Sequence, residues 1–140
     1  MLPPMAQIRH TETVPVRATE DIVRARQLVR DRAVEMGFSL VDQTKMVTAA
    51  SELARNAVVY GGGGEMRVEM IENGARRGLR LTFADRGPGI ADVNLALKDG
   101  YTTGTGLGLG LGGARRLANE FEIESRPGEG TRVAITRWKL

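Results

Sequence analysis

The chain has 140 residues, of which 41% are hydrophobic, 4% aromatic and 26% charged, with a net charge of +3 and no cysteine. The length suits one domain, the lack of cysteine excludes disulfides and thiolate metal sites, and no apolar run approaches the roughly 20 residues of a membrane-spanning helix. The 20 Lys and Arg residues are interleaved with 17 Asp and Glu residues, so we expect a mixed-charge surface with no nucleic-acid or membrane partner.

The first part of the chain predicts a leader, one strand and two helices. Residues 1–11 are expected to form a flexible leader, and alternating valines predict a strand over 12–18. Apolar residues at helical spacing then predict a helix over 20–36, which a glycine ends. A serine cap and a second apolar stripe predict another helix over 39–60, which stops at a run of four glycines.

The second part of the chain is rich in strands. The expected elements are strands over 65–72 and 78–84, a short helix after residue 90, a helix over 108–120, and a closing hairpin of strands over 121–126 and 131–138. The order predicts an α/β fold, a two-layer α/β sandwich in which helices pack on one face of a mixed β-sheet. Residues 12–140 are expected to form this single domain.

On the second predicted helix, Glu52 and Asn56 lie four residues apart and therefore share one face. An amide oxygen is a hard ligand that suits Mg²⁺, an ion that takes one or two protein oxygens beside phosphates and water. A carboxylate one turn away could accept a proton as a general base. The alternative is a solvated polar face with Arg55 as a partner, which is the commoner meaning of such a pair by itself.

A second informative segment, residues 85–90 (DRGPGI), follows an apolar run. Asp85 accepts hydrogen bonds and donates none, so it could accept from the exocyclic amine of adenine and disfavour guanine. Gly87 and Gly89 would let a ligand approach the backbone closely. The alternative is a plain turn, because the segment is rich in turn-forming residues.

The third segment, residues 104–110 (GTGLGLG), alternates glycine with other residues just before a helical pattern. Its backbone amides and the following helix N-terminus favour phosphate. A flexible loop is an alternative. A dinucleotide-binding fingerprint would need a strand directly before the glycines, and a Walker loop would need Gly-Lys-Ser/Thr, and neither is present.

In this order and spacing, the three segments resemble the GHKL superfamily, which includes gyrase, the ninety-kilodalton heat-shock chaperones, histidine kinases and MutL and shares the Bergerat ATP-binding fold. Residues 51–56 (SELARN), 85–90, 99–104 (DGYTTG) and 128–131 (GEGT) further resemble one branch, the RsbT-type serine/threonine switch kinases of bacterial stress signalling. The resemblance covers about residues 19–138.

The resemblance implies a cytoplasmic bacterial protein kinase with the Bergerat fold that uses ATP and Mg²⁺. It implies substrates that are serine or threonine residues on STAS-domain scaffold and antagonist proteins in a stressosome-like complex. It also implies that the freed kinase binds and activates a PPM-type phosphatase. A homodimer is left open.

The matched motifs also imply a role for each site residue. Glu52 would be the catalytic base or would orient the attacking group, Asn56 would hold Mg²⁺, and Asp85 would read adenine. The other nucleotide-binding residues that the resemblance implies are Gly87, Gly89, Ile90, Gly104, Thr105, Gly106, Leu107, Gly108, Leu109, Gly110 and Thr131.

The sequence departs from the family pattern in two ways. Many relatives carry a basic residue in the lid to meet the γ-phosphate, whereas here the nearest are Lys98, Arg115 and Arg116. The stretch from 89 to 104 is also short, which speaks against an ATP-driven clamp. The alternatives are an anti-sigma factor serine kinase that binds a sigma factor directly, a non-catalytic ATP-binding interaction module, and a stand-alone ATPase.

Overall fold

The structure is a computed structural model that describes residues 7–98 and 110–139. Five strands form one sheet in the order β1-β2-β3-β5-β4, and every neighbouring pair among them is antiparallel. The strands are β1 (Gln7–Val16), β2 (Gly64–Asn73), β3 (Arg76–Asp85), β4 (Glu120–Arg126) and β5 (Gly130–Trp138).

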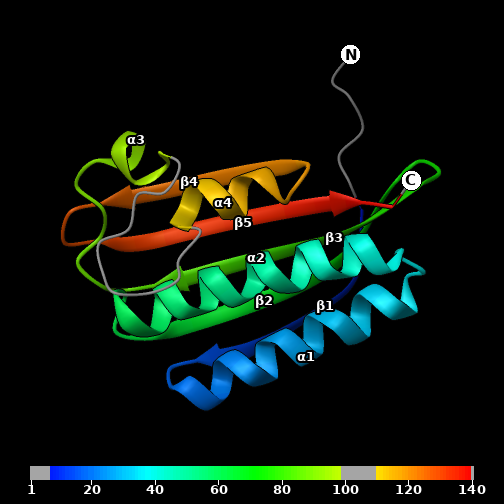
Figure 1. Ribbon diagram of the computed structural model, residues 1–140, viewed down its shortest axis with the longest axis horizontal. Helices are drawn as coiled ribbons and strands as arrows, with labels where there is room; N and C mark the ends of the chain where they lie inside the picture. Colours follow the sequence, from blue (N-terminus) through cyan, green and yellow to red (C-terminus); the bar gives the residue numbers. More distant parts are fainter. Residues whose placement is uncertain (1–6, 99–109, 140) are drawn as a thin grey trace.

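Figure 1 shows helices α1 (Thr19–Glu35), α2 (Leu40–Val59) and α4 (Gly110–Arg116) on one face of this sheet, with α1 and α2 side by side. The short helix α3 (Val93–Ala96) lies near the end of the sandwich where α2 finishes. None of the helices in the described ranges has the length and apolar character that crossing a membrane requires.

The predicted two-layer α/β sandwich is confirmed, but the expectation of a mixed sheet is wrong. Two helices separate β1 from β2, so the chain reverses three times, into α1, into α2 and into β2, and β2 runs antiparallel to β1 (Figure 1). The crossover through α4 does make β4 parallel to β3, but β5 lies between these two strands and is antiparallel to both. The two parallel strands are therefore never neighbours.

The sheet also begins earlier than the sequence indicated. β1 starts at Gln7, which pairs with Glu72 of β2, so residues 7–11 belong to the sheet and not to a leader. The pairing shifts between Ile8 and His10, and a bulge of this kind suits an edge strand. Residues 1–6 lie outside the described part of the chain.

The hydrophobic core lies between the sheet and the helices that cover it. Each strand directs alternate side chains toward α1 and α2, and each helix contributes one apolar face. Its largest fully buried members are Met46, Leu53, Met66, Leu79, Leu81 and Ile135. Burial on this scale contributes about 1.5–3 kcal/mol for each large side chain.

Polar contacts fix α2 against the rest of the domain. Ser39 caps the helix by accepting the backbone N–H of Asp42 at 3.1 Å, as the sequence predicted. The Asp42 carboxylate accepts a hydrogen bond of 2.8 Å from Arg137 of β5, which also donates to the carbonyl of Leu117 at 3.0 Å. These bonds hold α2, β5 and the end of α4 in one arrangement.

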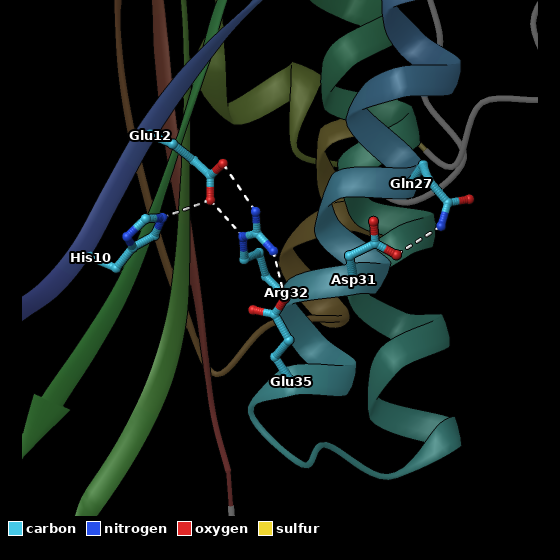
Figure 2. Close-up of polar contacts among 6 residues, drawn as sticks. All are labelled: His10, Glu12, Gln27, Asp31, Arg32 and Glu35. Carbon is cyan, nitrogen blue, oxygen red and sulfur yellow. Dashed lines mark hydrogen bonds and ion pairs between the residues drawn. The ribbon is translucent and has the colours of Figure 1, made fainter.

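A second polar cluster, which we call the α1–β1 clamp, consists of His10, Glu12, Arg32 and Glu35 (Figure 2). Arg32 of α1 donates from Nε to Glu12 of β1 at 2.6 Å and from Nη1 to Glu35 at 2.8 Å. His10 Nε2 lies 3.0 Å from the same Glu12 carboxylate. The hydrogen bond from Arg32 lowers the pKa of Glu12 and also raises the pKa of Arg32.

Candidate functional site

A cavity of about 480 Å³ opens at the end of the sandwich where α2 finishes. Its walls come from α2, the segment after β3, α3, the start of α4 and the start of β5. The predicted site residues that line it are Glu52, Asn56, Asp85, Gly89, Ile90, Gly110 and Thr131. Residues 79 positions apart in the chain therefore meet at one site.

Asp85 ends β3 and forms one wall of the cavity. Its Oδ1 accepts the backbone N–H of Gly87 at 2.9 Å. The backbone of Gly61 lies so close that a Cβ there would come 2.4 Å from Asp85 Cγ. Among the described residues, no donor is hydrogen-bonded to the second oxygen, Oδ2, so it can accept from a ligand.

Two further glycines shape this wall because a side chain would not fit. Gly89 has a φ of +77°, and a Cβ there would lie 2.1 Å from the Arg126 carbonyl oxygen. Gly130 has a φ of +85°, and a Cβ there would lie 2.2 Å from the Asp85 carbonyl oxygen. The β3 and β4–β5 segments can therefore approach each other closely.

A chain of hydroxyl groups joins β4, β5 and the segment after β3. The Ser125 hydroxyl lies 2.8 Å from the Thr131 hydroxyl and accepts the backbone N–H of Ile90 at 2.7 Å. The position of the Ile90 segment is thus tied to Thr131 through Ser125. Both Ile90 and Thr131 line the cavity, so the hydrogen bonds of the Ser125 hydroxyl fix two of its walls.

The opposite wall is α2, where Glu52 and Asn56 face the cavity from successive turns. Glu52 Oε1 accepts the backbone N–H of Gly110 at 3.2 Å, which ties α2 to the first residue of α4. The side-chain amide of Asn56 has no hydrogen-bond partner among the described residues. Its oxygen is therefore available to a metal ion or a ligand.

The side-chain oxygens of Asn56 and Glu52 fit a magnesium ion better than a transition metal. No group of three or more His, Cys, Asp or Glu side chains that could hold a metal occurs in the part of the chain that the structure describes. An amide oxygen beside a carboxylate suits Mg²⁺, which takes few protein ligands and completes its shell with water and phosphate oxygens. Asn56 is the residue that would hold it.

The predicted glycines differ in how they relate to the cavity. Gly87 does not line the cavity, but it holds Asp85 through its N–H. Gly110 has a φ of +66° and begins α4 at the cavity wall. The phosphate-loop residues 104–109 lie outside the described residues.

Several lining residues were not predicted from the sequence, and three of them bear on the site. Arg55 and Tyr60 of the α2 end line the cavity, and so does Gly61. The spacing rule that selected Glu52 and Asn56 could have found two of them, because Arg55 is three residues after Glu52 and Tyr60 is four after Asn56. Gly61 carries no such signal, since its role comes from its contact with Asp85.

Comparison with known proteins gives a family and individual relatives. The family profile for histidine kinase-, DNA gyrase B-, and HSP90-like ATPases matches residues 41–140. Serine/threonine-protein kinase RsbT of Bacillus subtilis (strain 168) is 46% identical over 118 residues, or 84% of this chain and 89% of the relative. Anti-sigma F factor of Thermoanaerobacter sp. (strain X514) is 28% identical over 124 residues, or 81% and 82% of the two chains.

Solved structures share the fold. A crystal structure of RsbU and RsbW domains from Mycobacterium tuberculosis matches with a TM-score of 0.65 and 21% identity. The match covers 94% of this chain and 33% of the other, so this chain spans about a third of that protein. The mycobacterial sensor histidine kinase MprB matches with a TM-score of 0.54 and 20% identity, over 93% and 98% of the two chains.

Proposed function

The chain belongs to the family of histidine kinase-, DNA gyrase B- and HSP90-like ATPases and, within it, to the RsbT-type serine/threonine-protein kinases, and we propose that it is the switch kinase of a bacterial partner-switching pathway. In this proposal it transfers the terminal phosphoryl group of ATP to a serine or threonine of a STAS-domain protein in a cytoplasmic, stressosome-type complex. The freed kinase then binds and activates a PPM-type phosphatase.

The observation that carries this proposal is the meeting of Glu52, Asn56, Asp85 and Thr131 around one cavity. A carboxylate oxygen without a protein donor suits the exocyclic amine of adenine, and here Asp85 Oδ2 is such an oxygen. The amide of Asn56 would hold Mg²⁺, which neutralises phosphate charge when it is bound. The cavity therefore supplies a base-reading end and a phosphate end.

Glu52 is proposed as the general base. The hydroxyl oxygen of the acceptor attacks the γ-phosphorus, the bond to the β–γ bridging oxygen breaks, and ADP leaves. The proton of the hydroxyl passes to the Glu52 carboxylate. The Gly110 N–H donates to Oε1 of Glu52, and no described residue donates to Oε2. Oε2 can therefore receive this proton.

The test is single-turnover transfer from γ-labelled ATP to purified STAS-domain proteins. Glu52→Gln keeps the size of the side chain and removes its basicity, so transfer should slow by roughly 10²–10⁴-fold at saturating nucleotide. Glu20→Gln, at an exposed site on α1, is the matched control and should transfer at the wild-type rate. A wild-type chain that labels no STAS protein would contradict the proposal, and equal rates for Glu52→Gln would remove Glu52 as the base.

The second candidate is an anti-sigma factor kinase that binds a sigma factor directly. The 28% identity to anti-sigma F factors supports it, but the 46% identity to RsbT favours STAS and phosphatase partners. A pull-down with the tagged chain separates the two, because it recovers either STAS proteins with a phosphatase or a sigma factor. Retention of Glu52, Asn56 and Asp85 in one cavity argues against a non-catalytic module.

A further inference from the structure

The cavity walls hold more negative than positive charge. Three carboxylates line it, those of Glu52, Asp85 and Asp92, whereas Arg55 is the basic residue among the described residues that line it. A nucleoside triphosphate brings several further negative charges. Because like charges at close range in a partly enclosed site repel strongly, a cation from the protein would offset this repulsion in addition to a metal ion.

Arg55 is placed to supply that cation. It lies on α2 directly before Asn56 and three residues after Glu52, and like both of them it lines the cavity. A glutamate three residues away on a helix can pair with an arginine. Here, however, Glu52 Oε1 accepts from the Gly110 N–H, and no ion pair or hydrogen bond joins Arg55 to any described residue. Its guanidinium is therefore available to a ligand.

The other basic residues near the site are placed differently. Lys98 follows α3, and Arg115 and Arg116 lie in the last turn of α4. All three are exposed, and none lines the cavity. The sequence between residues 101 and 114 contains no lysine or arginine. Among the residues that the structure describes, Arg55 of α2 is therefore the basic residue that can reach a ligand in the cavity.

We infer that Arg55 binds the terminal phosphate of the nucleotide and makes the site prefer a triphosphate over a diphosphate. This inference rests on the proposed function. A guanidinium presents parallel N–H donors that match two phosphate oxygens, which makes it suited to a terminal phosphate. After transfer the diphosphate lacks this contact, so the same residue would favour release of the product.

The test measures affinity and does not depend on turnover. Dissociation constants for ATP, ADP and AMP are measured by calorimetry, with Mg²⁺ and without a protein substrate, for wild type, Arg55→Ala and Arg55→Lys. Arg55→Ala should weaken ATP binding by about 10- to 100-fold and change ADP binding by less than about twofold. Arg55→Lys, which keeps the charge, should recover part of the loss.

Arg115→Ala is the matched control, since it removes an arginine that does not line the cavity, and its affinities should equal those of wild type. If circular dichroism shows that Arg55→Ala does not fold, Arg55→Gln takes its place. An equal loss of ATP and ADP affinity, or an unchanged ATP affinity, would overturn the inference while leaving the proposed kinase function intact. A wild-type chain that binds no nucleotide would overturn both.

Discussion

Two polar clusters of the domain differ in whether their side chains have partners within the protein. In the α1–β1 clamp, Arg32 reaches both Glu12 and Glu35, and His10 reaches Glu12 (Figure 2). In the cavity, the amide of Asn56 and the guanidinium of Arg55 reach no described partner. Asn56 and Arg55 are only half-buried, so water can satisfy these groups until a ligand replaces it. The cavity groups are thus available to a ligand, whereas the clamp groups are already paired with one another.

The difference has an energetic consequence. Groups that satisfy one another stabilise the fold, and a change in the clamp should alter the free energy of unfolding. Polar groups that face a ligand contribute to binding instead, so replacing such a group in the cavity should alter affinity with little effect on unfolding. Measuring both quantities for variants in each cluster tests whether the two regions are as separate as the contacts indicate.

The largest effect is expected from Gly61→Ala. A Cβ at this position would lie 2.4 Å from Asp85 Cγ, so the carboxylate must move. Overpacking costs about 1–3 kcal/mol of folding free energy, and the displaced Asp85 would also lose its polar contact with the nucleotide, which costs a similar amount of binding free energy, so ATP affinity should fall by roughly 100-fold. Calorimetric titration with ATP measures this.

Gly62→Ala is the control for Gly61→Ala. Its Cβ would meet no atom within 4 Å, although its φ of +71° makes the backbone unfavourable for alanine. It should therefore lower stability slightly and keep most of the ATP affinity. Equal loss of affinity in both variants would mean that ATP binding depends on the flexibility of the glycine run and is independent of the contact between Gly61 and Asp85.

Asp85→Asn should have the next largest effect. Asn keeps an acceptor for the Gly87 N–H but can place a donor toward the base, which conflicts with the adenine amine. A mismatched buried contact costs about 1–3 kcal/mol, so ATP affinity should fall about tenfold or more and the preference for ATP over GTP should shrink. Asp92→Asn, which changes another cavity carboxylate, should leave that preference unchanged.

Asn56→Ala should produce a smaller loss that depends on the metal ion. If the amide oxygen holds Mg²⁺, Mg·ATP binding should weaken several-fold, about 1 kcal/mol, while ATP binding in EDTA should stay the same. Titrations with and without Mg²⁺ make the comparison. Equal losses under the two conditions would assign Asn56 a structural role, and the contrast between the clamp and the cavity would then weaken.

Much of this arrangement could be predicted because the sequence patterns that indicate it involve residues close together in the chain. The four-residue spacing of Glu52 and Asn56 placed both on one helix face, and the structure has them on one cavity wall. Ser39 was recognised as a helix cap from its neighbours alone. Asp85 was predicted at the end of a strand, and β3 ends there.

The features that were missed depend on pairing between distant segments. Gly61 meets Asp85 because Gly64 pairs with Asp85 across β2 and β3, and no local pattern encodes that register. Ser125 acts through Thr131 and the Ile90 segment, which a spacing rule along one strand does not reach. Residues 7–11 are exposed in an edge strand, so they lack the apolar alternation that marks a half-buried strand.

The smallest effect is expected in the clamp, from Glu12→Gln. Arg32 donates two hydrogen bonds to Glu12, and this contact lowers the pKa of that carboxyl below its ordinary value of 4.5, against the opposing effect of burial. A pKa that is lower in the folded state stabilises the fold above about pH 4.5, and the stabilisation is lost as the pH falls through the folded-state pKa. Glu12→Gln should therefore cost about 1 kcal/mol at pH 7 and progressively less in acid.

Urea unfolding at neutral pH and in increasingly acidic buffers measures this dependence. Glu35→Gln is the matched control, because Glu35 contacts the same guanidinium at 2.8 Å but its side chain is 56% exposed, against 25% for Glu12. An exposed pair contributes at most about 1 kcal/mol and often nothing measurable, so Glu35→Gln should cost less than Glu12→Gln. Both variants should bind ATP as wild type does, since neither residue lines the cavity. If Glu12→Gln weakened ATP binding as much as Asp85→Asn, the clamp and the cavity would be coupled, and stability could not be assigned to one region and binding to the other.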